Sequence, residues 1–133
     1  MPPSLETPVI PPKNARKTAI FLALSASFLF GAVQAQAHAL LTSSEPAAKS
    51  KGAAPQTIQL HFSEEIATKF STIKLTDIDG KVVATTPVPT ADAKTLVAKP
   101  VAPLTPGLYT VSYVNVATDD GHKMTGSFSF TVK

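Results

Sequence analysis

Hydrophobic and polar residues alternate along several short segments downstream of residue 38. Residues 57–63, with the sequence TIQLHFS, place Ile58, Leu60 and Phe62 on one face and polar side chains on the other. An alternation with this period predicts a β-strand whose apolar face lies in a core. Further segments alternate in the same way or are rich in the β-branched and aromatic residues that favour strands: residues 71–77, 81–84, 95–98, 108–116 and 127–132.

Turn-forming residues separate the predicted strands. The Asp79-Gly80 pair stands between two apolar runs and predicts a hairpin. Pro100 and the two prolines that follow it are expected to keep their connection out of a central sheet position. Residues 85–93, rich in Thr, Pro and Ala, are expected to form a loop, and residues 64–70 have enough helical character for one or two turns.

About seven short strands with turn residues between them predict an all-β protein. The expected architecture is a small Greek-key β-barrel or an immunoglobulin-like sandwich of antiparallel strands. A domain of this length can be stabilised by burial of a hydrophobic core alone.

A different pattern precedes residue 38. Lys13, Arg16 and Lys17 stand before a 15-residue apolar run at residues 19–33, and Ala35-Gln36-Ala37 has small residues at its first and third positions. This order is typical of a cleavable secretory signal peptide, and the run is shorter than the roughly 20 apolar residues of a membrane-spanning helix. We therefore expect residues 1–37 to be a signal peptide that is removed, and residues 38–133 to be one exported domain that spans no membrane.

Composition narrows the classes of function. The 133-residue chain has no cysteine, which excludes disulfides, thiolate zinc sites, iron–sulfur clusters and thiol catalysis. Its formal charge of +3 comes mostly from the leader, because nine basic and eight acidic residues remain after residue 37. The remaining chain has neither a basic stripe nor an RNA-reading aromatic motif, so nucleic-acid binding is not expected.

Histidines and one acidic residue are the candidates for chemistry. Asp120 and His122 are two residues apart, so on an extended segment both side chains would share a face and reach one ion; a turn with an exposed histidine is the alternative. If cleavage makes His38 the first residue, its free α-amine and imidazole can chelate one metal ion; a frayed terminal residue is the alternative. Three nitrogens and a carboxylate suit Cu(II), which stands highest in the Irving–Williams order. His61 is expected on the polar face of its strand.

Several motifs together carry a resemblance that covers most of residues 38–133. They are His38-Ala39 after the leader, Leu60-x-Phe62-Ser63-Glu64, Leu104-x-Pro106-Gly107-x-Tyr109-x-Val111, and Asp120-Gly121-His122 followed by Gly126-Ser127-Phe128-Ser129-Phe130-Thr131-Val132. In order and separation they resemble the CopC family of periplasmic copper-resistance proteins.

The resemblance implies a periplasmic β-barrel or sandwich that binds Cu(II) at one end. By the family's pattern the ligands are the amine and imidazole of His38, the carboxylate of Asp120 and the imidazole of His122. Glu64 matches a family position close to the copper and would orient a ligand through a hydrogen bond, with a solvent-facing charge as the alternative. Some family members bind Cu(I) in a methionine-rich loop, but residues 84–96 contain neither Met nor His, so no dedicated Cu(I) site is expected.

The leading hypothesis is a monomeric Cu(II) carrier or buffer in copper resistance. The resemblance also suggests a CopD-like inner-membrane copper transporter as a partner. Four protein ligands leave no open position for a substrate, which argues against an enzyme. Two alternatives stay open: a copper-dependent enzyme similar to the polysaccharide monooxygenases, with an N-terminal histidine brace, and a metal-free immunoglobulin-like binding module. Because amine and imidazole ligands bind copper only when deprotonated, copper affinity is expected to fall below neutral pH.

Overall fold

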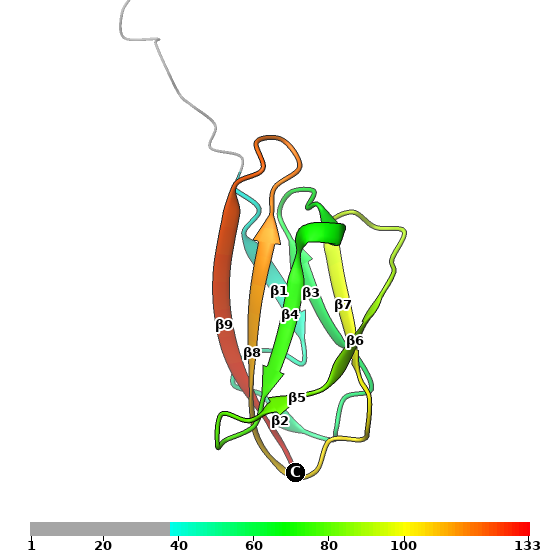
Figure 1. Ribbon diagram of the computed structural model, residues 1–133. Helices are drawn as coiled ribbons and strands as arrows, with labels where there is room; N and C mark the ends of the chain where they lie inside the picture. Colours follow the sequence, from blue (N-terminus) through cyan, green and yellow to red (C-terminus); the bar gives the residue numbers. More distant parts are fainter. Residues whose placement is uncertain (1–37) are drawn as a thin grey trace, which may run out of the picture. The chain divides into compact units, whose positions relative to one another are not determined.

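The computed structural model describes residues 38–133, which form two facing β-sheets (Figure 1). One sheet has the strand order β1-β3-β7-β6, and the other has the order β2-β9-β8-β4-β5. The elements are β1 (Leu41–Glu45), β2 (Lys51–Gly52), β3 (Ile58–Phe62), the 3₁₀ turn η1 (Thr68–Phe70), β4 (Thr72–Thr76), β5 (Val82–Val83), β6 (Thr85–Val88), β7 (Thr95–Pro100), β8 (Gly107–Val116) and β9 (Lys123–Val132). Within these residues the paired strands are antiparallel except for β2 with β9. The predicted all-β class and sandwich architecture are confirmed.

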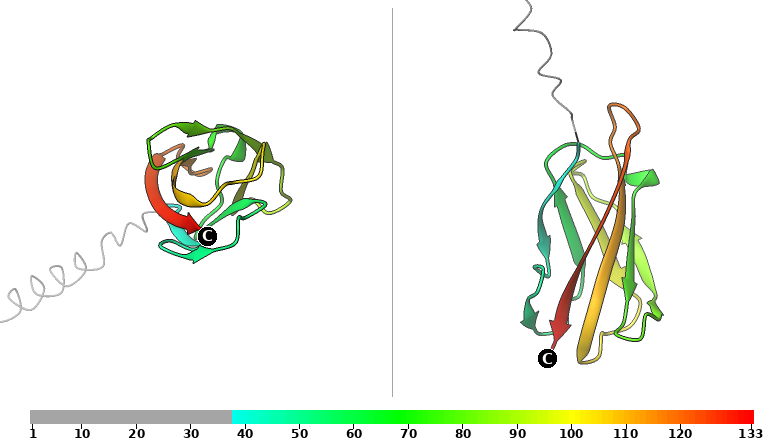
Figure 2. Two further views of the ribbon diagram at one scale, coloured as in Figure 1. Left: turned by 90° about the horizontal axis from the view of Figure 1, so that it is seen from below. Right: turned by 90° about the vertical axis from the view of Figure 1, so that its left-hand side faces the viewer.

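The core lies between the sheets, which enclose a common interior in the end-on view of Figure 2. Ile58, Leu60 and Phe62 of β3 are buried, as their alternation predicts. From the opposite sheet, the rings of Tyr109 and Phe130 stack with their centroids 5.7 Å apart. Full burial of a side chain of this size contributes roughly 1.5–3 kcal/mol. The core therefore fixes which face of each strand points inward.

The long hairpin of β8 and β9 is the central feature of the five-stranded sheet. Its strands pair over ten positions, from Gly107 with Val132 to Val116 with Lys123, and β8 also pairs with β4. The expected central position of residues 108–116 is confirmed. The last predicted strand begins earlier than expected, at Lys123, and so carries the hairpin to the end of the sandwich.

The prediction of a loop over residues 85–93 is partly wrong, because its first four residues form β6. This strand pairs with β7 from Thr85 with Pro100 to Val88 with Val97. It lies at the edge of its sheet, where the missing N–H of Pro87 is tolerated. The Thr, Pro and Ala content of residues 85–93 predicted a loop because proline is rare in strands, although an edge strand can contain it.

Strand β7 is also longer than predicted and ends on a proline. The adjacent β3 pairs with β7 only from Thr95 to Ala98, so Pro100 lies beyond that pairing. Strands β1 and β2 were not predicted at all. Within residues 38–133 the structure thus has nine strands rather than about seven.

The predicted hairpin at Asp79-Gly80 is confirmed by the pairing of β4 with β5. Gly80 adopts a φ of 78°, a left-handed conformation that glycine reaches without strain. The helical character of residues 64–70 gives the single turn η1. No helix in residues 38–133 has the length and hydropathy needed to cross a bilayer. The predicted signal peptide, residues 1–37, lies outside the described residues.

Candidate metal centre

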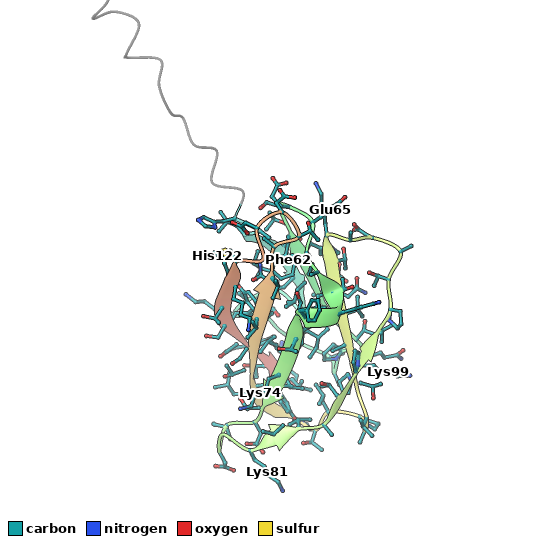
Figure 3. All side chains as sticks on the ribbon, turned by 45° about the horizontal axis from the view of Figure 1, so that its top comes forward. Phe62, Glu65, Lys74, Lys81, Lys99 and His122 are labelled. Carbon is teal, nitrogen blue, oxygen red and sulfur yellow. The ribbon has the colours of Figure 1, made fainter. Side chains whose placement is uncertain are left out.

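Three segments that are distant in sequence meet at one end of the sandwich. They are the start of the described chain, the connection from β3 to η1 and the connection from β8 to β9 (Figure 1). In Figure 3, His122 and Glu65 lie at this end and Lys81 lies at the other. The sheet topology therefore brings together the candidate residues that the sequence separates.

The segment with Asp120 and His122 is a turn rather than an extended strand. The Asp120 carboxylate accepts a hydrogen bond from the His122 backbone N–H, with 2.9 Å between Oδ1 and N. Gly121 has a φ of 69°, and its N–H donates to the carbonyl of Ala117 (3.1 Å). This turn keeps the carboxylate close to His122, and both residues are exposed.

His38 and His122 are neighbours, although 84 positions separate them in the sequence. The centroids of their imidazole rings are 5.1 Å apart, and the ring planes are inclined by 48°. His38 is half-buried and His122 is exposed. Two imidazoles at this separation can turn toward a common ion.

The backbone after His38 is fixed by Ser63. The Ser63 hydroxyl accepts a hydrogen bond from the N–H of Leu40 (3.0 Å) and donates to the carbonyl of His38 (3.2 Å). The Ser63 N–H donates to the carbonyl of Leu40 (2.8 Å). Between these contacts the side chain of Ala39 is only 1% exposed and packs in the core. The sequence motif that contains Ser63 predicted no role for this residue. Its hydrogen bonds show that Ser63 holds the backbone of His38 and Leu40.

Glu64 is exposed, and its carboxylate has no hydrogen-bond or ion-pair partner among residues 38–133. The next residue ties this connection to the β8–β9 turn, because the carbonyl of Glu65 accepts hydrogen bonds from the N–H (3.3 Å) and hydroxyl (3.2 Å) of Thr118. In the part of the chain that the structure describes, no three His, Asp or Glu side chains are grouped closely enough to hold a metal ion. A complete centre needs a further donor beside the two imidazoles.

His61 lies outside this group and belongs to a separate network. Its Nδ1 is 3.1 Å from the Thr95 hydroxyl, which donates to Asp92 Oδ2 at 2.7 Å. Since the hydroxyl proton is directed to Asp92, the Thr95 oxygen accepts from a protonated Nδ1 of His61. His61 is on the polar face, as predicted, and is half-buried.

Hydrogen bonds to the carboxylate lower the pKa of Asp92 below its ordinary value, chiefly that from the Lys94 N–H (2.9 Å) and then that from Thr95. A carboxyl group with a lowered folded-state pKa stabilises the fold above its unfolded pKa and loses this effect as the pH falls through the folded value. We expect Asp92→Ala to be less stable than the wild-type protein at pH 6, with the difference shrinking below about pH 4. Urea unfolding at stepped pH measures this, and a difference that is independent of pH would contradict it.

These features define a small β-sandwich with an imidazole-bearing end, and the comparison with known families agrees. Residues 41–133 match the family model of the CopC domain, so the chain belongs to the CopC family. The resemblance to the CopC family that the sequence motifs indicated is thereby confirmed.

Several relatives of this chain are named copper resistance proteins or CopC. The chain is 43% identical over 120 residues to copper resistance protein C of Pseudomonas syringae pv. tomato, covering 85% of this chain and 94% of that protein. Among solved structures, PcoC, a methionine-rich copper resistance protein from Escherichia coli, is 44% identical, with a TM-score of 0.66 over 73% of this chain and all of PcoC. CopC from Methylosinus trichosporium OB3b is 30% identical, with a TM-score of 0.67 over 72% of this chain and 94% of its own.

Proposed function

We propose that the protein is a periplasmic Cu(II)-binding protein that carries or buffers copper and so contributes to copper resistance. The observation that carries this proposal is the approach of the His38 and His122 rings to 5.1 Å at the end of the sandwich. Family membership and relatives named copper resistance protein C support copper as the metal.

Cleavage of a signal peptide after Ala37 supplies the further donor. It leaves residues 38–133 and gives His38 a free α-amine, which forms a six-membered chelate ring with the imidazole. The imidazole of His122 and the carboxylate of Asp120 would complete the set once the side chains close on the ion, because among residues 38–133 these three side chains are not grouped tightly and Asp120 Oδ1 accepts the His122 N–H. Nitrogen-rich ligation with one carboxylate is the donor chemistry that Cu(II) favours.

The donors favour Cu(II) over Cu(I). Thioether sulfur selects Cu(I), and PcoC is described as methionine rich, whereas this chain has two methionines in all. One of them, Met124, follows the leader and is half-buried in β9, where it pairs with a residue of β8.

The same ligand set supports a carrier rather than an enzyme. Four protein donors around the ion leave no vacant position of the kind that metal catalysts keep for a substrate. The protein acts as a monomer in the periplasm and passes copper to an inner-membrane transporter similar to CopD. The exposed carboxylate of Glu64 has no partner among residues 38–133, and it would orient a ligand through a hydrogen bond that forms when the ion is bound.

Competition titrations of the processed protein with Cu(II) and Zn(II) test this function. We expect one Cu(II) ion per chain, bound more tightly than Zn(II), as the Irving–Williams order requires for these donors. Binding of Zn(II) with equal or greater affinity would refute the copper assignment. Cleavage of a polysaccharide by the copper-loaded protein would refute the carrier role.

A further inference from the structure

Asn115 interrupts the inward-facing row of strand β8. Alternate residues of this strand point into the sandwich, among them Tyr109 and Val111, which are buried, and Tyr113, which packs against the core. The next residue in this row is Asn115, and it is only 1% exposed. A polar amide therefore occupies a position where the pattern of the strand predicts a hydrophobic side chain.

The amide group makes one directed contact. Nδ2–H of Asn115 donates to the backbone carbonyl of Ala39 across 2.9 Å, joining residues that are 76 positions apart. Its Oδ1 is buried and has no hydrogen-bond partner among residues 38–133. A buried acceptor without a partner costs free energy that an apolar residue of similar size would not. The side chain is thus poorly suited to pure packing, and its donor to Ala39 is its distinctive contribution.

Asn115 and Ser63 hold consecutive carbonyls of the same short segment. Ser63 binds the carbonyl of His38 and both backbone groups of Leu40, and Asn115 binds the carbonyl of Ala39 between them. These bonds fix the backbone that immediately follows His38. A backbone that is held at these three residues limits the positions that the His38 ring can reach.

We propose that Asn115 is a positioning residue for copper binding, which holds the Ala39 carbonyl and thereby keeps His38 in the arrangement that receives the ion. This inference rests on the proposed function, since it assigns a role at the same site. A ligand whose binding-competent arrangement is populated for only a fraction of the time has its affinity reduced by that fraction. Loss of the Asn115 bond should therefore weaken copper binding without removing any copper ligand.

The test compares processed wild-type protein with Asn115→Val, which retains bulk and strand propensity, and with Tyr109→Phe as a matched control. Tyr109→Phe also removes the hydrogen bonds of a buried β8 side chain, those of the Tyr109 hydroxyl with the carbonyl (2.8 Å) and the hydroxyl (3.2 Å) of Thr105, but at the opposite end of the strand. Two quantities are measured: Cu(II) affinity by chelator competition, and hydrogen exchange of the Leu40 amide in the metal-free protein.

We expect Asn115→Val to bind Cu(II) about tenfold more weakly, equivalent to about 1.4 kcal/mol, and to exchange its Leu40 amide about tenfold faster. Tyr109→Phe should change neither quantity. A folded Asn115→Val with wild-type copper affinity overturns the inference, whatever its exchange rate. If Asn115→Val does not fold, the smaller Asn115→Ala carries the same expectations.

The two proposals fail in different ways. If wild-type protein binds no Cu(II), the proposed function is wrong and the role of Asn115 in copper binding falls with it. If wild-type protein binds Cu(II) tightly and Asn115→Val and Asn115→Ala do so equally, only the positioning role is wrong.

Discussion

Adding one methionine before His38 in the processed protein is expected to weaken Cu(II) binding by more than about 100-fold. The extension converts the α-amine of His38 into a peptide nitrogen and so removes both a donor and the chelate ring. Even hydrogen-bond partners outside a ligand set alter metal affinity by about 10- to 100-fold, so the loss of a ligand should exceed that range. Isothermal titration with a competing chelator measures the change.

The matched control adds one glycine after the exposed Lys133, at the opposite terminus. This variant should bind copper as the wild-type protein does. Both extended proteins should unfold at the wild-type temperature, because the hydrogen bonds that Leu40 makes with Ser63 do not involve the α-amine. Full copper affinity in the methionine-extended protein would exclude the amine from the centre.

Substitution His122→Ala is expected to reduce Cu(II) affinity by a similar factor, more than about 100-fold. It removes the imidazole that lies 5.1 Å from the ring of His38 and leaves the chelate of His38 intact. His122 is exposed, so stability should change by no more than about 0.5 kcal/mol. Chelator competition and thermal unfolding of the same samples separate the two effects.

His61→Ala is the control for this substitution. His61 bonds to Thr95 in a different network, so its removal should leave copper affinity unchanged while lowering stability. The reverse outcome, with weak copper binding in His61→Ala and normal binding in His122→Ala, would move the metal to the outer face of the four-stranded sheet.

Strands with strong alternation were predictable because the period of the pattern coincides with burial on one face. In β3 the three apolar residues are all buried. In β9 the alternation of residues 127–132 places Phe128 and Phe130 on the inward face, and Phe130 is buried, whereas Phe128 is only half-buried and packs at the margin of the core. Alternation gives the face of a residue, but the depth of its burial depends on the opposite sheet.

Edge strands were not predictable in the same way. Strand β1, with the sequence LTSSE, has no buried residue, and β6 contains Pro87 and likewise has none. An edge strand is held by hydrogen bonds to one neighbour, and its side chains need not carry an apolar pattern. These segments become strands because β3 and β7 each have one side of backbone N–H and C=O groups available, and β1 and β6 pair with those groups.

The candidate site shows the same limit. The spacing of Asp120 and His122 left two readings open, an extended segment with both side chains on one face and a turn with an exposed histidine. The structure has the turn, in which the carboxylate accepts the His122 N–H. The approach of His38 to His122 follows from sheet topology, which neither local sequence contains. The role of Asn115 could not be predicted from the sequence, because its hydrogen-bond partner, the Ala39 carbonyl, is 76 positions away.

The central claim is that copper is held by a chain whose first residue is His38. Native mass spectrometry of the protein purified from the periplasm of copper-treated cells tests it most directly. The account predicts a single species with the mass of residues 38–133 plus one copper ion. A copper-bearing species that begins at any other residue would contradict it.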